Sequence, residues 1–419
     1  MDHKQLSEIF KSEYSNLIAV LCNYYGLTDL QLAEDIVSDT FLRAMKAWSH
    51  KGIPKFPKAW LRKVAQNLLY EHHRRKKIYE EKIAPELRFG NQQTDVVEIT
   101  DKIIEDSQLR MIFVLCDPEL NRESQLCIAL RVLCGFSIEE IARALLSHKE
   151  TINKRLYRAK KAIKERHKVE TNLTASQYAS RLDNVLRVIY LMFNEGYYSS
   201  VNEENIRYEI CWEAMRLGLF LSGQKIFPRQ KIHALIALMC FHASRLDART
   251  SGENGNLLYY EQDKGKWNKD LIQKGRKYLN RSAVGNEVSK YHLEAAIAYW
   301  HTVETQGKWD TILQLYNRLL LLEYSSSIAM NRTYALARAS SIDKAIEEAH
   351  KLELKDNHHY FCLLAELYRM NETIDKEIEY LGKAIKFANK ENEKELIKDK
   401  LEKAYQYHVQ KTGRKLPIP

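Results

Sequence analysis

The sequence predicts an all-α protein, with two small helical domains followed by a longer helical extension. The 419 residues contain only 15 glycines and 7 prolines. Leu, Ala, Glu and Lys are abundant, and apolar residues recur at helical spacing along most of the chain. The predicted segments are a helical domain, an acidic linker, a helix-turn-helix domain, a helical extension and a set of repeated helix pairs. In order, they span residues 1–78, 79–106, 107–168, 175–290 and 291–410.

The positive charge of the chain is concentrated in two blocks. The formal net charge is +10. Residues 46–77 hold ten Lys or Arg and one acid, and residues 149–168 hold nine and two. Between them, residues 78–123 hold five basic and eleven acidic residues, a balance typical of a linker that repels nucleic acid. The two basic blocks therefore indicate surfaces that neutralise phosphates.

The first domain is predicted to contain three helices. One ends at the turn Asn23–Gly26, the second covers Leu30–Trp48 and the third covers Lys58–Lys77. The outward face of the third helix interleaves aromatic and basic side chains. Melted or single-stranded nucleic acid binds such faces, because bases stack on aromatic planes while cations follow the phosphates. The alternative is a solvated helix face without a ligand.

The stretch Gly135–Lys168 has the layout of a helix-turn-helix. Apolar residues recur at helical spacing over Ile138–Leu146, and the polar turn Ser147-His148-Lys149 follows. A second, strongly basic helix is predicted to begin near Glu150. Two helices joined by a turn of about three residues form the DNA-binding motif in which the second helix enters the major groove. An amphipathic, Lys-rich surface helix is the alternative.

These blocks together resemble the sigma-70 family of transcription initiation factors, in particular its extracytoplasmic-function (ECF) class. The resemblance covers residues 1 to about 168. The matching segments are AEDIVSDTFLRA at 33–44, WLRKVAQN at 60–67 with the later HRR at 73–75, SIEEIA at 137–142 and TINKRLYRAK at 151–160.

The resemblance implies that the chain binds promoter DNA and core RNA polymerase, through the clamp helices of the largest subunit and the flap region. The residues that match the polymerase-binding helix, all expected to be exposed, are Glu34, Asp35, Asp39, Phe41 and Arg43. Those that match the reader of the minus-ten element are Arg62, Lys63, Asn67, Tyr70, Arg74 and Arg75. Those expected at the minus-thirty-five element are Lys149, Glu150, Thr151, Asn153, Lys154, Arg155, Arg158, Lys160 and Lys161.

The extension also resembles part of this class. Many family members have a glycine where this chain has Leu146, and the pair Leu145-Leu146 is similar to a subgroup that carries a C-terminal helical extension. Residues 181–197, 242–245 and 260–272 resemble that extension. Truncation after about Lys168 is expected to leave a folded sigma core.

Repeated helix pairs are predicted near the C-terminus. Trp309, Ile342 and Ile374 open successive helices at offsets of 33 and 32 residues, near the tetratricopeptide (TPR) period of about 34. Such TPR-like stacks present concave grooves that bind peptides or proteins. Two alternatives stay open, namely a purely structural stack and a groove that holds the sigma domains or the connector after residue 168.

Nothing in the sequence indicates catalysis. Phosphate-binding loops, nucleophile elbows and zinc-protease motifs are absent. The adjacent pairs His72-His73 and His358-His359 point to different sides of a helix, so neither suits a shared metal. Seven single cysteines indicate reduced thiols in the cytoplasm and no zinc site, and the lack of a long apolar run predicts no membrane contact. With the missing catalytic motifs, we expect no enzyme activity and no cofactor. The alternative function is a helix-turn-helix regulator whose solenoid binds a signal or partner and which acts independently of polymerase.

Overall fold

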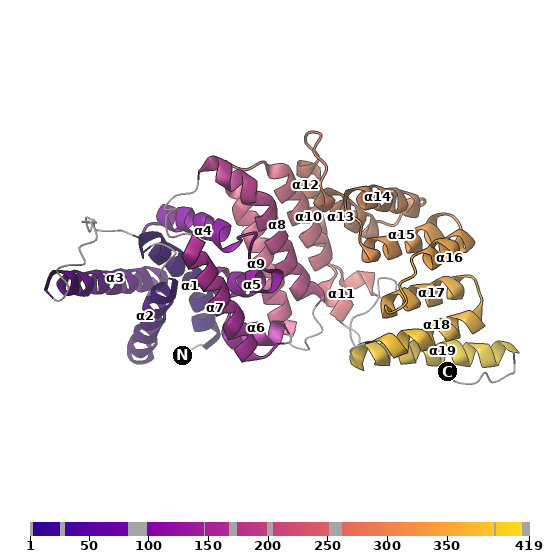
Figure 1. Cartoon of the computed structure of the whole chain (residues 1–419), viewed down its shortest axis with the longest axis horizontal. Coiled ribbons are helices and arrows are strands. Elements are labelled where there is room, and N and C mark those ends of the chain that lie inside the picture. The colour runs from indigo at the N-terminus through magenta and orange to yellow at the C-terminus, as the bar shows by residue number, and fades with distance from the viewer. Residues whose placement is uncertain are drawn as a thin grey trace. The chain divides into compact units, whose positions relative to one another are not determined.

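A computed structural model describes residues 3–25, 30–82, 99–145, 147–166, 174–198, 204–250, 262–388 and 391–412. All regular elements in these ranges are helices, so the predicted all-α class is confirmed. The chain forms two compact units, Met1–Phe227 and Pro228–Pro419, which are described separately (Figure 1). No helix in the described part of the chain is long and apolar enough to cross a membrane.

The N-terminal domain, residues 3–82, contains the three predicted helices. They are α1 (His3–Tyr25), α2 (Leu30–Lys51) and α3 (Pro57–Lys82). Pro57 opens α3, where its missing amide proton leaves no intrahelical bond unmade. The helix continues past its predicted end at Lys77, into the predicted linker. The rings of Trp48 and Trp60, 5.4 Å apart, join α2 to α3.

Helix α1 is buried on all sides over residues 17–22. These six consecutive side chains are 0–2% exposed. Such a helix must be covered on every face, since an amphipathic helix would leave one face to water. α1 packs on α2 and α3 on one side and on α4 and η2 of the next domain on the other. The first two domains therefore share this helix as a common core.

The helix-turn-helix domain, residues 99–166, follows. Its helices are α4 (Asp101–Leu115), α5 (Arg122–Ile128), the π-helical turn η2 (Ala129–Leu133), α6 (Ile138–Ala144) and α7 (Lys149–Arg166). Gly135 adopts a positive φ of 72° in the turn before α6, a conformation that favours glycine. Ser137 and Glu140 then form a capping box that begins α6.

The helix-turn-helix itself is α6 and α7. The Ser147 amide donates to the Ala142 carbonyl at 2.9 Å, and Ile152 to His148 at 3.1 Å. Leu146, where the turn departs from many family members, lies outside the described residues. So do residues 83–98 of the predicted linker, whereas α4 begins inside the C-terminal part of that linker.

The first part of the extension belongs to the first unit. Helices α8 (Ala175–Tyr198) and α9 (Glu204–Gly223) pack against each other and against the helix-turn-helix domain. Phe113 of α4 contacts the rings of Tyr178 and Phe227, at 5.0 and 5.1 Å. Arg187 donates to the Gln125 side chain at 3.0 Å. The predicted segment 175–290 thus contains the division between the two units.

The second unit begins with a buried helix, α10, on which α12 and α13 pack. Its helices are α10 (Arg229–Ala243), α11 (Leu246–Thr250), η4 (Lys264–Lys266), α12 (Lys269–Ser282), α13 (Lys290–His301), α14 (Lys308–Leu322), α15 (Ser326–Ala339), α16 (Ile342–Lys351), α17 (His358–Met370), α18 (Ile374–Phe387) and α19 (Glu391–Thr412). Residues 232–241 of α10 are all buried. Gly275 of α12 lies so close that a Cβ there would meet the Phe241 ring at 2.7 Å.

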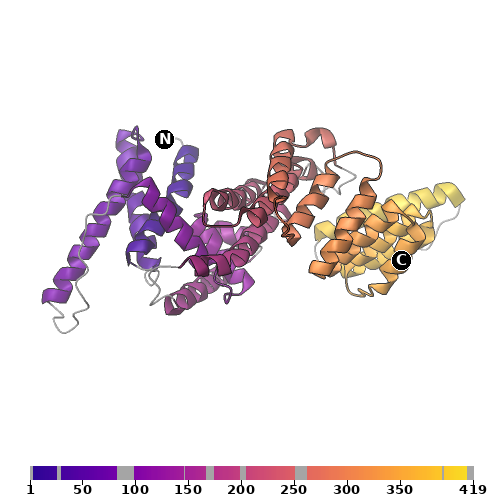
Figure 2. The same ribbon diagram turned by 90° about the horizontal axis from the view of Figure 1, so that it is seen from above.

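Helices α13 to α18 form successive pairs, α13 with α14, α15 with α16 and α17 with α18. Figure 2 shows the last helices of the chain, in orange and yellow, stacked side by side. The second helices begin at Lys308, Ile342 and Ile374, at or next to the predicted positions. Small buried residues such as Ala345, Ala349 and Ala365 let the helices approach closely. The final helix, α19, packs on α18 and ends the stack within the described residues.

Candidate nucleic-acid interface

One face of α7 is exposed and basic. Asn153, Lys154, Arg158 and Lys161 all lie on it, together with Tyr157, whose side chain is 69% exposed. Residues spaced by three and four positions neighbour one another on a helix, so these side chains form one continuous stripe. We call it the outer stripe. Four of the nine residues expected at a DNA element thus share a face.

Two residues at the edges of the buried face of α7 contact protein. Arg155 lies beside Cys127 of α5, a thiol whose pKa burial raises to about 11. The Lys160 ammonium donates to the carboxylate of Glu34 in α2 and, at 3.2 Å, to the Gln31 side chain. Lys160 is 23% exposed, whereas the adjacent Lys161 is 63% exposed. Arg155 and Lys160 are therefore held by the protein in this structure, and the expectation that both face DNA does not match the geometry.

The first turn of α7 is held against α6. Lys149 pairs with Glu139 at 2.8 Å, and this hydrogen bond lowers the pKa of the Glu139 carboxyl. Glu150 is exposed and Thr151 half-buried, both in this turn. The turn thus presents polar groups at a helix N-terminus, where backbone amides attract phosphates.

A second exposed stripe runs along α3. Lys63, Asn67, Arg74 and Arg75 are exposed on it. Tyr70 is half-buried, and its hydroxyl accepts a 3.4 Å hydrogen bond from the Gln66 amide.

Arg62 differs from the other α3 candidates. Its guanidinium binds the buried Glu13 of α1 at 3.4 Å and Asp101 of α4 at 2.7 Å. Because both partners are protein carboxylates, Arg62 joins the N-terminal domain to the helix-turn-helix domain. The expectation that Arg62 is left for nucleic acid is not met in this structure.

Two residues expected to be exposed on α2 are buried. Glu34 is 5% and Phe41 5% exposed, so the expectation of exposure is wrong for both. Phe41 packs on the Phe10 ring at 4.3 Å as part of the domain core. Asp35 is exposed, and Asp39 and Arg43, which pair at 3.3 Å, are each about half exposed.

Three exposed apolar side chains of the N-terminal domain were not singled out from the sequence. Leu42 and Met45 of α2 are 55% and 52% exposed, and Phe56 before α3 is 67% exposed. A signal was available, because Leu42 and Met45 fall outside the helical period of the buried residues Phe41, Ala44 and Trp48. Exposed apolar residues beside acidic ones indicate a protein-binding face.

The Glu34 carboxylate collects donors from three helices. The Tyr14 hydroxyl of α1 donates at 3.3 Å and Arg131 of η2 at 3.2 Å, in addition to Lys160 of α7. Burial, followed by the nearby Glu34 charge, raises the pKa of Tyr14 well above its usual value. We call Glu34, Arg131 and Lys160 the clasp. Along the chain, Arg131 lies 97 positions and Lys160 lies 126 positions from Glu34.

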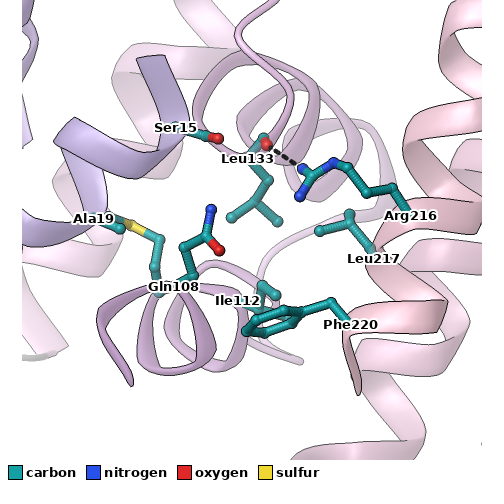
Figure 3. A pocket seen from close by; sticks show the side chains of 9 residues that line it. Ser15, Ala19, Gln108, Ile112, Leu133, Arg216, Leu217 and Phe220 are labelled. Atoms are coloured by element: carbon teal, nitrogen blue, oxygen red, sulfur yellow. Dashed lines mark hydrogen bonds between the residues drawn. The ribbon is translucent and has the colours of Figure 1, made fainter. Parts of the chain in front are cut away.

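A narrow crevice lies where α1, α4, η2 and α9 meet (Figure 3). Gln108 and Leu133 project toward it, and Arg216 of α9 donates to the Leu133 carbonyl at 3.1 Å. The Gln108 amide donates to Asn16 of α1. The crevice is a packing seam between domains.

The described residues contain no group of three or more His, Cys, Asp or Glu side chains placed to hold a metal ion.

In the described residues the fold is all-helical, with a helix-turn-helix and exposed basic stripes on α3 and α7. Residues 9–78 match the family model of sigma-70 region 2, and residues 108–163 match that of sigma-70 region 4. The chain therefore belongs to the sigma-70 family, as a factor of the ECF type. Residues 181–283 match a family of unknown function (DUF6596).

Two relatives are similar to this chain. An uncharacterized protein of Rhizobium meliloti (R00370) is 30% identical over 326 residues, which are 76% of each chain. The ECF RNA polymerase sigma factor BldN of Streptomyces coelicolor is 31% identical over 143 residues, 32% of this chain and 51% of that protein. Similarity to the first relative extends well beyond the length of the two sigma regions.

Proposed function

We propose that this sigma factor binds core RNA polymerase and directs promoter-specific initiation, with α3 at the minus-ten element and α7 at the minus-thirty-five element. The observation that carries the proposal is the pair of exposed basic stripes within the segments that match sigma-70 regions 2 and 4. Core polymerase and promoter DNA are the partners that family membership implies.

On α7, the outer stripe has the chemistry of major-groove recognition. Arg158 and Lys154 can donate to guanine edges, and Asn153 can pair with adenine. Lys161, farther along the same face, suits a phosphate. Lys149, Glu150 and Thr151 lie at the N-terminal end of the helix, the end that helix-turn-helix proteins direct toward base edges.

On α3, the stripe suits DNA that has begun to melt. Asn67 can read a base edge and Tyr70 can stack on a base, while Lys63, Arg74 and Arg75 follow the phosphates. Stacking on an aromatic side chain contributes about 1–3 kcal/mol per base.

On α2, the exposed acidic residues and the apolar pair Leu42 and Met45 form the face we assign to polymerase. Asp35 and Asp39 would attract a basic partner surface, and the apolar pair would supply buried area at its centre. Arg43 lies beside this face and also approaches Glu71 of α3 at 3.9 Å. Glu34 and Phe41 would contribute from beneath it.

The helix pairs of the second unit are proposed as a regulatory or partner-binding module. Leu321 and Tyr324, at the end of α14, are 87% and 71% exposed and would suit an apolar partner segment. The TPR-like spacing of α14, α16 and α18 supports a groove of the kind that binds peptides or proteins.

In vitro transcription with purified core polymerase and a pool of promoter sequences tests this function. The expected result is a stable complex with core polymerase and initiation from a subset of promoters that share two spaced motifs. DNA binding without a polymerase complex would instead favour the alternative, a helix-turn-helix regulator that acts alone.

A further inference from the structure

We propose that the extension carries a further nucleic-acid surface, the outward face of α12, which binds the phosphates of duplex DNA without regard to base sequence. This helix lies in the segment that matches the family of unknown function (DUF6596), outside both sigma regions. The proposal goes beyond the proposed function, because it concerns a DNA contact apart from the two promoter-reading helices.

Positive charge is as concentrated around α12 as in the two basic blocks described above. Residues 264–281 hold seven Lys or Arg and one acid, Asp270. The apolar side of the helix packs on α10, where Leu271 is buried and Gly275 lies against the Phe241 ring. The other side is exposed and carries most of the charge. We call its five exposed cations the α12 face, namely Lys269, Lys274, Arg276, Lys277 and Arg281.

The α12 face is one continuous surface. Lys274, Lys277 and Arg281 follow one another at spacings of three and four positions, so their side chains are neighbours on the helix. From Lys269 to Arg281 the helix rises about 18 Å at 1.5 Å per residue, which is the length of about five base pairs of duplex. Several phosphates of one duplex therefore lie within reach of the face.

The cations of the α12 face lack the carboxylates that neutralise other exposed cations of the second unit. On α18, Lys376 and Lys383 both pair with Glu379, at 2.8 and 2.7 Å. The three lysines of the α12 face, by contrast, have no ion-pair partner in the described part of the chain, and its two arginines lie over tyrosine rings. A basic surface without internal counter-charges indicates an external anion as its partner.

The composition of the α12 face suits phosphates better than a protein surface. The centres of protein–protein interfaces are enriched in aromatic residues and depleted in lysine. No large apolar side chain of α12 is exposed. Protein–DNA interfaces are instead polar and strongly positive. The phosphates of a duplex form a regular line of negative charge, and a basic face can bind that line whatever the base sequence.

Packing and capping hold the α12 face in a fixed position. The Asn268 side chain begins the helix by accepting a hydrogen bond from the Leu271 amide at 3.0 Å, and the Asn268 amide donates to the Ser244 carbonyl at 2.8 Å. Because the backbone is already ordered, binding costs mainly the freedom of the charged side chains. On a duplex that the first unit also binds, the face would add affinity without changing which promoter is chosen.

The salt dependence of DNA binding by the full-length chain tests the proposal. K274Q/K277Q removes two cations from the α12 face. K376Q/K383Q makes the same charge change at two paired lysines of α18 and is the matched control. Fluorescence anisotropy measures the affinity for two duplexes of unrelated sequence, each of about 30 base pairs, between about 50 and 200 mM salt.

We expect K274Q/K277Q to lower the slope of log affinity against log salt by about two units, because two phosphate contacts are lost. Binding at about 100 mM salt should weaken roughly tenfold, by the same factor on both duplexes. The K376Q/K383Q control should leave the slope and the affinity unchanged.

Photo-crosslinking shows whether the α12 face touches DNA directly. The crosslinking residue p-benzoylphenylalanine replaces Gln273, which is exposed among the cations, or Glu347, which is exposed on α16. Position 273 should crosslink to the labelled duplex and position 347 should not. An absent crosslink at position 273 would contradict direct contact.

The outcomes separate this proposal from the proposed function. An unchanged slope in K274Q/K277Q, while R158A on α7 lowers it, overturns the proposal and leaves the proposed function intact. Unchanged DNA binding with weakened binding of core polymerase assigns the face to an acidic protein surface and also overturns the proposal. So does a slope change that K376Q/K383Q reproduces. The expected slope change in a chain that fails to bind core polymerase overturns only the proposed function.

Discussion

The two units of the chain use charge in different ways. In the first unit, ion pairs such as Glu34–Lys160 and Glu13–Arg62 join helices far apart in sequence, and the carboxylates are buried. In the second unit, pairs such as Lys351–Glu348 and Lys383–Glu379 lie three or four residues apart on exposed helix faces. Local pairs add little stability because water screens them. Buried long-range pairs instead fix how domains are arranged, so the first unit is where charge changes should alter conformation.

Truncation should give the largest effect and tests where the first unit ends. A chain ending after Lys168 lacks α8 and α9, which cover Phe113 (0% exposed) and Leu133 (5% exposed) of the helix-turn-helix domain. We expect it to aggregate or to lose cooperative unfolding, contrary to the expectation from sequence. A chain ending after Phe227 should remain folded. Size-exclusion chromatography and thermal unfolding compare the two, and equally stable monomers would contradict this role of α8 and α9.

Glu34→Ala should give the next largest effect, because it removes the buried carboxylate that joins helices of the first unit. It leaves Arg131 and Lys160 without their shared carboxylate. We expect about 2–3 kcal/mol of destabilisation, less than for a fully buried pair because both cations keep some contact with water. Glu379→Ala in the second unit, whose carboxylate pairs with Lys376 and Lys383 on its own helix, is the control, with an expected loss of about 0.5 kcal/mol or less. Thermal unfolding of the two variants measures the difference in stability. Equal losses of stability would show that burial of the clasp contributes no additional stability.

Glu377 of the second unit differs from the exposed carboxylates described above, because its side chain is buried. Burial raises the pKa of this carboxyl to about 7, with Arg369 opposing the shift and Glu366 adding to it. The folded pKa lies above the unfolded value of 4.5, so the folded state binds the proton more tightly. Stability should therefore be full below pH 4.5 and decrease as the pH rises toward 7, by on the order of 2 kcal/mol.

Glu377→Gln, which stays neutral, should remove this part of the pH dependence and stabilise the unit near pH 8. Differential scanning calorimetry between pH 4.5 and 8 records the effect. An identical pH profile for both proteins would mean that Glu377 does not titrate in that range.

The smallest effect distinguishes an unpaired cation of the outer stripe of α7 from the neighbouring Lys160, which pairs with Glu34. Arg158→Ala on the outer stripe should lower the salt dependence of DNA binding by about one unit of slope, because one phosphate or base contact is lost. Lys160→Ala should leave the slope of the free chain nearly unchanged, because Glu34 already neutralises that ammonium. Sequence alone predicts the same loss for both residues. Fluorescence anisotropy at several salt concentrations decides between them.

Much of the fold could be predicted from the sequence, because helix periods and caps are local. The three helices of the N-terminal domain, the helix-turn-helix and the starts of α16 and α18 all lie at or near their expected positions. The burial of Glu34 could not be predicted, because its partners lie 97 and 126 residues away. The helical period placed it correctly on α2, but only the packing of the second domain shows that this side of α2 is covered.

For the basic residues of α7, too, the sequence predicts the helix but not which side chains contact other parts of the protein. Lys154, Arg158 and Lys161 lie on the outer stripe as a basic recognition helix requires, whereas Lys160 shares their residue type and faces protein. The uninterrupted apolar run at 17–22 was the available signal, since a helix that is apolar all round must be buried on all sides. The run indicates that α1 packs against an element outside its own domain, but it does not identify that element.

The most direct test of the account is the distance between spin labels at S49C of α2 and E165C of α7, both exposed positions, measured in the full-length chain before and after addition of core RNA polymerase. We predict one short distance in the free chain and an increase of several tens of ångströms in the complex, because the two promoter elements are far apart. A distance that stays short in a transcriptionally active complex would contradict the proposed assignment of α3 and α7 to two separate promoter elements.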